Sequence, residues 1–366
     1  MMEERLSRDE IVYLLELEDR ETREEVFAAA RRLRFRYFGP KIFLYGFIYF
    51  STWCRNHCTF CNYRAPNVLC QRYRKTEGEI IEAAVHLAES GVQLIDLTMG
   101  EDPFYFQEAS CFDSLLNLVQ DVKNETGLPI MISWGVVPEE ILEKLPEVGA
   151  DWFACYQETH NPQLFRRLRI GQDYSHRFEM KYEALQRGIL VEEGILSGVG
   201  ETLGDVANSI WTMRAMEVQQ VRVMNFVPQM GTPMEQTVPP SPNRERMIIA
   251  VMRIVMPQRL IPASLDVDGI NGLRGKLEAG ANVVTSLIPP RSDLMGVARS
   301  TLEIVEGQRA ATAVLPIIDA LGMRKATLED YLLWINKAKR NLCRNTLSAS
   351  DRDVESSHCW WEATGG

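Results

Sequence analysis

The sequence predicts an α/β fold, a single (β/α)8 barrel with an N-terminal helical extension and a short C-terminal tail. Three observations support this prediction. From residue 42 onward, apolar runs rich in β-branched and aromatic residues alternate with stretches of helical period. Near-continuous apolar strands of this kind belong to parallel sheets that helices cover on both faces. Eight such units, with polar residues gathered just after the strands, match the size and active-site face of a barrel.

Two helices are expected ahead of the barrel, in residues 1–41. Ser7 is followed three residues later by Glu10, a capping-box pattern that starts the first helix. Thr22 and Glu25 repeat the pattern for the second helix. The N-terminal segment should therefore be helical and separate from the sheet.

The barrel is expected in residues 42–325. Its strands should be Ile42–Phe50, Val92–Met99, Pro129–Trp134, Trp152–Tyr156, Ile189–Leu196, Val221–Val227, Leu260–Leu265 and Asn282–Ile288. The stretches with helical period are Glu77–Glu89, Phe112–Thr126, Pro138–Val148, Ser175–Arg187, Gly204–Met216, Asn243–Met256 and Ile270–Ala279. An open, doubly wound sheet is the structural alternative, because the sequence gives the number of strand–helix units but not whether the first and last strands pair to close a barrel. Residues 326–366 should form a C-terminal helix and, after Lys339, a polar tail.

Composition and charge exclude several classes of protein. The 366 residues are 46% hydrophobic and carry a net charge of −10, which suits a large folded domain without a nucleic-acid footprint. No uncharged apolar run reaches the roughly 18 residues that a membrane helix needs. The charged segment Met1–Glu10 is unlike a signal peptide. We therefore expect a cytoplasmic protein with neither a membrane nor a nucleic acid as partner.

Three of the eight cysteines, Cys54, Cys58 and Cys61, form a C-x3-C-x2-C array directly after the first strand. Three thiolates on one short loop can bind three irons of a 4Fe–4S cube and leave the fourth iron open to a substrate or cofactor. A structural zinc site is the alternative, and it requires a fourth ligand such as His57 or Cys70. That alternative would make the protein a zinc-stabilised binding module without catalysis.

The array, with Phe60 before its last cysteine, is similar to the motif of the radical S-adenosylmethionine (SAM) enzymes. The resemblance implies a 4Fe–4S cluster whose open iron binds the methionine part of SAM, and a 5′-deoxyadenosyl radical formed with one electron. Met99, Gly100 and Glu101 follow the second strand where the superfamily has a Gly-Gly-Glu segment that binds the SAM ammonium. Because methionine replaces the first glycine, only backbone contacts are carried over at Met99 and Gly100.

Further segments resemble the branch of the superfamily that contains biotin synthase and the hydrogenase maturases. In that branch a Glu matching Glu158 contacts the SAM ribose or methionine, and an Arg matching Arg177 approaches the SAM carboxylate. A salt bridge between Glu158 and Arg177 is the structural alternative. Gly198 and Phe226, at the ends of the fifth and sixth strands, match backbone contacts to the adenine, as does Phe60.

Within this branch, residues 7–325 resemble the methylornithine synthases of pyrrolysine biosynthesis, above all in Asp96–Pro103 and Leu260–Asp266. The resemblance implies a mutase that isomerises L-lysine to 3-methyl-D-ornithine through a 5′-deoxyadenosyl radical. It also implies a low-potential electron donor such as a flavodoxin or ferredoxin. A hydrogenase-maturase-like enzyme with another small amino-acid or thiol substrate is the alternative.

Polar side chains at strand ends are candidates to bind such a substrate. Asp96 and Arg222 stand within apolar runs, where an unpaired charge is costly, so they either neutralise each other or meet a charged ligand. We assign Arg222 to the α-carboxylate of the substrate and Asp96, Ser264 and Asp266 to its amines. Ser286, on the eighth strand, is a further candidate.

Overall fold

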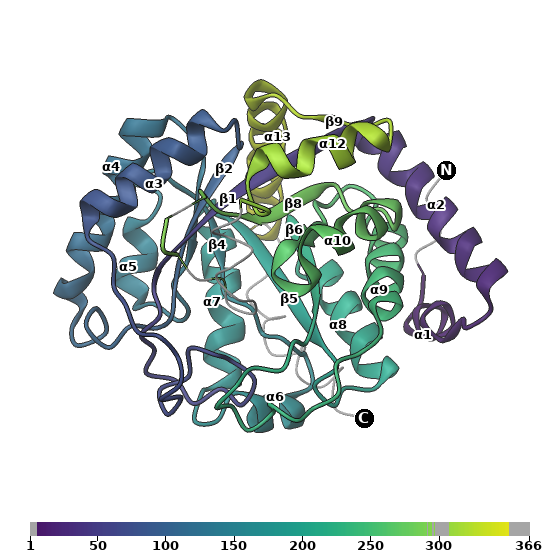
Figure 1. Cartoon of the computed structure of the whole chain (residues 1–366), viewed down its shortest axis with the longest axis horizontal. Helices are drawn as coiled ribbons and strands as arrows, with labels where there is room; N and C mark the ends of the chain where they lie inside the picture. The colour runs from purple at the N-terminus through teal and green to yellow at the C-terminus, as the bar shows by residue number, and fades with distance from the viewer. Residues whose placement is uncertain (1–5, 291, 295, 297–306, 351–366) are drawn as a thin grey trace.

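The computed structural model describes residues 6–290, 292–294, 296 and 307–350. A ring of strands occupies the middle of the molecule, with helices around its outside (Figure 1). Ahead of the ring come α1 (Arg8–Glu16) and α2 (Arg20–Phe38). These two helices pack against α8 (Leu203–Ala215) and α9 (Pro242–Val255) of the barrel, at one side of the view in Figure 1.

The two N-terminal helices begin at the capping residues that their sequences provide. In α1 the Ser7 hydroxyl accepts a hydrogen bond from the Glu10 amide, and the Glu10 carboxylate accepts one from the Ser7 amide at 2.7 Å. The second helix starts before Thr22, because the Asp19 carboxylate caps it by accepting hydrogen bonds from the Glu21 and Thr22 amides.

Eight parallel strands form the barrel. They are β1 (Lys41–Ser51), β2 (Leu94–Met99), β3 (Ile130–Ser133), β4 (Ala150–Ala154), β5 (Leu190–Ser197), β6 (Gln220–Asn225), β7 (Pro262–Ser264) and β8 (Val283–Leu287). Their order is β6-β5-β4-β3-β2-β1-β8-β7. The ends of this path meet at a parallel bridge, where the Val221 amide donates to the Leu260 carbonyl at 3.0 Å and the Leu260 amide donates to the Gln219 carbonyl at 3.1 Å. The sheet is a nearly closed barrel, so the predicted (β/α)8 fold is confirmed over the open sheet.

Helices follow the strands in the alternating order that the sequence predicts. They are α3 (Glu77–Glu89), α4 (Asp113–Thr126), α5 (Glu139–Lys144), α6 (Pro162–Leu168), α7 (Tyr174–Gln186), α8 (Leu203–Ala215), α9 (Pro242–Val255), α10 (Leu265–Glu278), α12 (Ala311–Ala320) and α13 (Leu328–Ser350). A short 3-10 helix, η1 (Ala109–Phe112), leads into α4, and a two-residue strand, β9 (Arg324–Lys325), pairs with the start of β1. Among the described residues no helix is both long and apolar enough to cross a bilayer.

Several elements differ from their predicted extent, among them the seventh strand, α6 and the last helix. The seventh strand is shorter than expected, because the Ser264 hydroxyl caps α10 by accepting a hydrogen bond from the Asp266 amide at 3.2 Å. The seven-residue helix α6 was not predicted, and it begins where Asn161 provides the cap. The last helix continues past Lys339 to Ser350. The rest of the expected tail, residues 351–366, lies outside the described residues.

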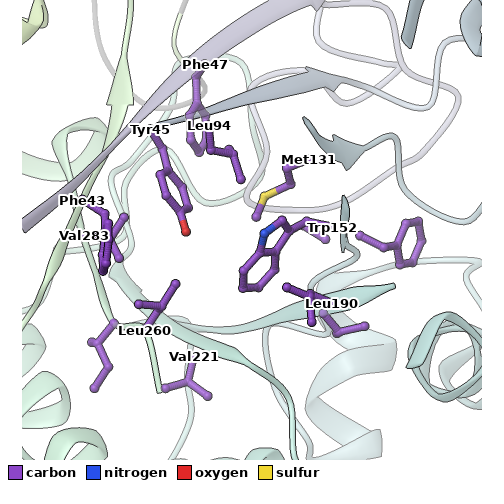
Figure 2. Close-up of a cluster of buried hydrophobic side chains, with 14 of the residues drawn as sticks. Phe43, Tyr45, Phe47, Leu94, Met131, Trp152, Leu190, Val221, Leu260 and Val283 are labelled. Carbon is purple, nitrogen blue, oxygen red and sulfur yellow. The ribbon is translucent and has the colours of Figure 1, made fainter. Parts of the chain in front are cut away.

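Large apolar side chains fill the interior of the barrel (Figure 2). Tyr45, Leu94, Met131 and Trp152 point toward one another there, and each is fully buried. Alternate residues of a strand face the same side, so the polar positions Asp96 and Thr98 follow Leu94 on its side of β2. The apolar base therefore carries a polar layer above it, toward the carboxyl ends of the strands.

Helix α13 packs against the amino-terminal end of the barrel. The Tyr331 hydroxyl lies 2.6 Å from the Tyr45 hydroxyl, and the Tyr331 ring lies 5.2 Å from the ring of Phe43. The Trp334 ring stacks on Trp152 at 5.8 Å between ring centres. This end of the barrel is filled with aromatic side chains, which leaves the opposite end for a ligand site.

Candidate active site

The three cysteines of the array lie on the loop after β1 and line one cavity at the carboxyl ends of the strands. Backbone hydrogen bonds hold this loop at both ends. The Arg55 amide donates to the Glu101 carbonyl at 2.9 Å, and the Thr59 amide donates to the Leu168 carbonyl at 2.8 Å. The loop is thereby attached to the end of β2 and to the end of α6, so its cysteines face a cavity of about 220 Å³.

The cysteine environment fits thiolates bound to a positively charged group. The Cys58 sulfur accepts hydrogen bonds from the Gln172 amide nitrogen at 3.0 Å and from the Arg169 guanidinium at 3.6 Å. Burial raises the pKa of Cys54 to about 11 and also raises the pKa of Cys61, so free thiols would stay protonated here. Metal coordination removes such protons.

A 4Fe–4S cube does not require its cysteines to meet at one point, because each thiolate binds a different iron. Among the described residues, no three His, Cys, Asp or Glu side chains gather as ligands of a single metal ion. Cys54, Cys58 and Cys61 nevertheless share one cavity wall. This donor set fits a cluster held by three thiolates.

Two glycines permit close contacts in the site: Gly100 lets the end of β2 approach the cysteine loop, and Gly135 lets the Glu101 carboxylate approach the backbone after β3. A Cβ on Gly100 would lie 2.3 Å from the Trp53 carbonyl and 2.8 Å from the Cys54 Cβ, so β2 can meet the cysteine loop only with glycine here. Gly135 has a φ of +81°, and a Cβ there would lie 2.4 Å from Oε1 of Glu101. The Glu101 carboxylate accepts hydrogen bonds from the Val136 amide at 3.1 Å and from Arg55 at 3.0 Å.

Glu158 and Arg177 both line the cavity, and the salt bridge between them that was the structural alternative does not form. Glu158 instead pairs with Arg169 at 2.8 Å, while Arg177 lies 3.5 Å from the Glu101 carboxylate. Glu158 has a φ of 68°, a left-handed conformation that is uncommon outside glycine and typical of functional sites. Burial raises the pKa of Glu158 in spite of the opposing Arg169. Both residues are thus held by other charges and face the same space.

A buried ion pair behind the cavity fixes the end of β4. The Glu193 carboxylate accepts hydrogen bonds from the Gln157 and Gly194 amides at 2.8 and 2.7 Å, and it pairs with Lys181 of α7 at 2.7 Å. Lys181 also donates to the Cys155 carbonyl at 3.1 Å. The segment that leads into Glu158 is therefore fastened to both β5 and α7.

The remaining predicted SAM residues divide into two groups. Phe60, Met99, Gly100 and Phe226 line the same cavity as the cysteines. Gly198 is not among the residues that line it. Its amide donates to the Glu201 carboxylate at 2.8 Å, and a Cβ on it would lie 2.5 Å from Pro240. The glycine serves the turn into α8, which is a structural role that its sequence motif did not distinguish.

All five predicted substrate residues are buried, and none of them is among the residues that line the cysteine cavity, although their chain neighbours Thr98, Met224 and Val267 do line it. They are Asp96, Arg222, Ser264, Asp266 and Ser286, each at most 3% exposed. The charges pair differently from the predicted alternative of an Asp96–Arg222 bridge. Arg222 donates to Glu192 at 2.6 Å and to the Thr285 hydroxyl at 3.2 Å. Its second terminal nitrogen, Nη2, is a buried donor without a hydrogen-bond partner among the described residues.

Asp266 is surrounded by donors from this chain. Its Oδ2 accepts hydrogen bonds from Tyr49 and Ser286, both at 2.6 Å, and its Oδ1 accepts one from Arg309 at 2.7 Å. Burial alone would raise the pKa of Asp266, but Arg309 and the two hydroxyls outweigh it and lower the pKa. Ser286 has a φ of 65°, so two of the predicted site residues, Glu158 and Ser286, adopt the left-handed conformation.

Asp96 carries the least compensated charge of this group. Neither of its carboxyl oxygens has a hydrogen-bond partner in the described part of the chain. Its pKa is raised to about 8, mainly by burial and also by the neighbouring Glu192, while the Ser133 hydroxyl and Arg222 act to lower it. We call the group of buried side chains Asp96, Arg222, Asp266 and Ser286 the polar chamber. It offers a carboxyl and a guanidinium N–H to a ligand that brings complementary charges.

Several functional candidates were missed by the sequence analysis. Glu192 lies next to Glu193 in the apolar run of β5, and this pair of buried charges gave the same kind of signal as Asp96 and Arg222. Arg169 was not among the predicted site residues, although it contacts both Glu158 and Cys58. Arg309 lies far along the chain, outside any strand end, and nothing in its sequence context indicated that it reaches Asp266.

Comparison with known proteins places the chain in a class and then in a family. A family model described as the Radical SAM superfamily matches residues 48–210, which include the cysteine loop and much of the cavity. The chain is 44% identical over 326 residues to the 3-methylornithine synthase of Methanosarcina acetivorans, covering 89% of this chain and 92% of the relative. It is 30% identical over 281 residues to the FeFe hydrogenase maturase subunit HydE of Thermotoga maritima, covering 76% and 79%.

The structural comparison agrees with the sequence comparison. The crystal structure of methylornithine synthase (PylB) superposes with a TM-score of 0.86 at 43% identity, covering 90% of this chain and 97% of that one. The chain therefore belongs to the 3-methylornithine synthase family of radical SAM enzymes.

Proposed function

We propose that this enzyme isomerises L-lysine to 3-methyl-D-ornithine, the first step of pyrrolysine biosynthesis. The single observation that carries the proposal is the polar chamber, which lies under the cysteine-lined cavity and presents Asp96 and Nη2 of Arg222. An amino acid with a side-chain ammonium brings both charges that these two groups complement. Identity of 44% to a 3-methylornithine synthase supports the same substrate.

In this proposal Cys54, Cys58 and Cys61 hold the cluster. When bound, the cluster and SAM supply a 5′-deoxyadenosyl radical that abstracts hydrogen. Glu101 and Arg177 face the charged groups of SAM. Further contacts to SAM come from Phe60, Met99, Gly100, Glu158 and Phe226.

The polar chamber orients the substrate. Arg222, held in place by Glu192, presents Nη2 to the α-carboxylate. Asp96 binds one ammonium, while Asp266, Ser264 and Ser286 surround the other. Asp266 already accepts three hydrogen bonds, so one of its roughly four acceptor positions remains for the amine.

Burial of the polar chamber also protects a reactive substrate. Each of its polar side chains is at most 3% exposed, so water is excluded when the cavity above is filled. A dry site strengthens the charge pairing and prevents side reactions of a radical with solvent. The residues of the chain thus orient the substrate, pair with its charges and keep water out of the site.

The test is turnover by anaerobically purified enzyme with reductant, SAM and L-lysine. We expect 3-methylornithine, detected by mass spectrometry. Arg222→Lys should lower its formation strongly, because a lysine ammonium cannot reproduce the fixed geometry of the guanidinium held by Glu192. SAM cleavage should continue in this variant. Cluster-loaded enzyme that cleaves SAM yet leaves lysine unchanged would overturn the substrate assignment.

The alternative, a hydrogenase-maturase-like enzyme with another small amino-acid or thiol substrate, has the 30% identity to HydE in its support. It predicts SAM cleavage stimulated by a thiol or by an amino acid other than lysine. Metal analysis tests the zinc alternative at the same time, since a colourless protein with one zinc and no iron would rule out the radical mechanism.

A further inference from the structure

The turn between α6 and α7 brings two hydrogen-bond donors to the sulfur of Cys58. The side-chain amide nitrogen of Gln172 lies 3.0 Å from this sulfur, and Nη1 of Arg169 lies 3.6 Å from it. The two residues follow Cys58 by 114 and 111 positions in the chain. By contrast, the sulfur of Cys54 accepts a hydrogen bond from Asn56 of its own loop, at 3.5 Å. The donors to Cys58 are therefore supplied by the barrel and not by the cysteine motif.

Arg177 fixes the orientation of the Gln172 side-chain amide. Nη1 of Arg177 lies 3.2 Å from Oε1 of Gln172. A guanidinium group only donates hydrogen bonds, so the end of the amide that faces Arg177 must be the oxygen. The amino end of Gln172 is then the end that faces Cys58, and it donates to the sulfur.

Backbone contacts hold both donors in place. The backbone amide of Gln172 donates to the Arg169 carbonyl at 3.1 Å, which closes the turn. The Tyr156 carbonyl, just after β4, accepts hydrogen bonds from Nη2 of Arg169 at 3.0 Å and from Nε of Arg177 at 2.8 Å. One carbonyl thus positions both guanidinium groups, and the donors to Cys58 are preorganised.

These contacts lie in a largely dry part of the site. Cys58 is 5% exposed and Arg169 is 7% exposed. Hydrogen bonds and charges act more strongly where water is excluded. Glu158 pairs with Arg169 at 2.8 Å and offsets part of its positive charge. Gln172 is a neutral donor, so its effect on the sulfur depends on the hydrogen bond alone.

We propose that Gln172 and Arg169 raise the reduction potential of the cluster by donating hydrogen bonds to the Cys58 thiolate. A low-potential reductant loses one electron, the cluster gains it, and no atom is transferred. The added negative charge is shared by the sulfur ligands, so donors to a sulfur stabilise the reduced cluster more than the oxidised one. The proposal rests on the cluster of the proposed function and is independent of L-lysine as the substrate.

A purely structural role is the alternative, in which the two side chains only hold the cysteine loop against the barrel. The loop has other attachments, however. The Thr59 amide donates to the Leu168 carbonyl at 2.8 Å, and the Arg55 amide donates to the Glu101 carbonyl at 2.9 Å. Removal of the Gln172 donor should therefore leave the loop in place and change the potential.

The test measures the midpoint potential of the cluster in a variant without the donor. Gln172→Leu keeps a similar side-chain volume but cannot donate to Cys58. We expect an anaerobic redox titration followed by EPR to give a more negative midpoint potential than in the parent. At a fixed applied potential the ratio of reduced to oxidised cluster should fall by up to about tenfold, which is about 59 mV for a one-electron couple. Gln163→Leu, on the exposed surface of α6, is the control and should have the parental potential.

Gln172→Glu is the second variant, because it has nearly the same shape as the parent. Its carboxylate keeps the contact to Arg177 and replaces the donor that faces Cys58 with a negatively charged acceptor. The midpoint potential should therefore fall further than in Gln172→Leu.

Analysis of iron and sulfide shows whether each variant contains a full cluster. Parental potentials in both Gln172 variants at full cluster content would overturn the proposal. Loss of the cluster from both variants would also overturn it, because Gln172 would then be required for cluster assembly. A parent enzyme with zinc and no iron would contradict the proposed function itself and would show no cluster EPR signal. The two failures are thus distinguishable, and none of these measurements requires lysine turnover.

Discussion

If Asp96 binds the substrate as proposed, it should make substrate binding dependent on pH. Burial raises its pKa to about 8, so the carboxyl is mostly protonated near neutral pH before a ligand enters. An ammonium group is stabilised by the carboxylate and not by the protonated acid. We therefore expect the KM for L-lysine to fall as pH rises toward 8, by up to about tenfold per pH unit, and then to level off. Initial rates of 3-methylornithine formation across this range measure the effect.

The isosteric change Asp96→Asn is the control for this pH profile. It should raise the KM and remove its pH dependence in this range, and an unaltered profile would mean that another group titrates.

The stability of the Asp96→Asn variant gives an independent readout of the Asp96 pKa. The folded-state pKa lies above the unfolded value of 3.8, so Asp96 makes folding less favourable as pH rises between the two values. The variant should gain in free energy of unfolding relative to the parent by up to about 1.4 kcal/mol per pH unit in that window.

Gly135 controls the position of Glu101. Alanine at this position has a strained φ, and its Cβ overlaps Oε1 of Glu101. We expect Gly135→Ala to weaken SAM binding about tenfold, measured by equilibrium dialysis with the cluster-loaded enzyme. Gly127 provides the matched control, since its φ is +64° and a Cβ there meets nothing within 4 Å. Gly127→Ala should cost about 1 kcal/mol of stability and leave SAM binding intact. Equal losses of SAM affinity in both variants would contradict the assignment.

At the scale of elements, the pair of Glu193 and Lys181 connects β4, β5 and α7. Glu193→Gln leaves the Lys181 ammonium buried without its carboxylate. Breaking a buried pair in this way costs about 3–5 kcal/mol. Urea unfolding of the variant should show this loss, whereas Glu183→Gln, which breaks a surface pair with Arg187, should change stability by less than about 0.5 kcal/mol. A Glu193→Gln variant as stable as the parent would show that the pair contributes little.

Element positions were largely predictable because the barrel strands are continuous apolar runs and the helices are capped. Helix α3 has the predicted bounds, since Thr76 and Glu79 form a capping box at its start. The seven residues of α6 are too few to display a period of 3.6. Leu265 continues the apolar run of β7 but belongs to α10, because the Ser264 cap ends the strand.

Site residues were predictable where the sequence places a charge in an apolar run or repeats a known motif. Asp96, Arg222 and the cysteines carry such signals, and the structure gathers them at one end of the barrel. The charge pairing was not predictable, because it depends on which strands adjoin. Glu192 reaches Arg222 because β5 and β6 are neighbours, with Gly194 opposite Arg222 in register. The Arg309 contact to Asp266 joins segments 43 residues apart, and no local pattern reports it.

At the scale of the whole molecule, the two ends of the barrel have separate tasks. The amino-terminal end is an aromatic plug in which Tyr331 contacts Tyr45 and Phe43. Tyr331→Ala should lower the free energy of unfolding by about 3–5 kcal/mol, because it leaves a cavity and an unpaired hydroxyl. SAM affinity should not change, since the cavity lies at the other end. Leu333→Ala on the exposed face of α13 is the control, expected within about 0.5 kcal/mol of the parent in denaturant titrations.

On the proposed function, the depth of the polar chamber should set the order in which the substrate and SAM bind. Thr98, Tyr156, Met224 and Val267 line the cavity immediately above Asp96, Arg222 and Asp266. SAM in that cavity would block access of the substrate to these buried residues. We expect an ordered sequence, with L-lysine first and SAM second. S-adenosylhomocysteine should then inhibit competitively against SAM and uncompetitively against L-lysine, while a random sequence would give a different pattern. In this arrangement bound SAM would also close the path from the polar chamber to solvent. The product would then be released only after SAM has left the cavity.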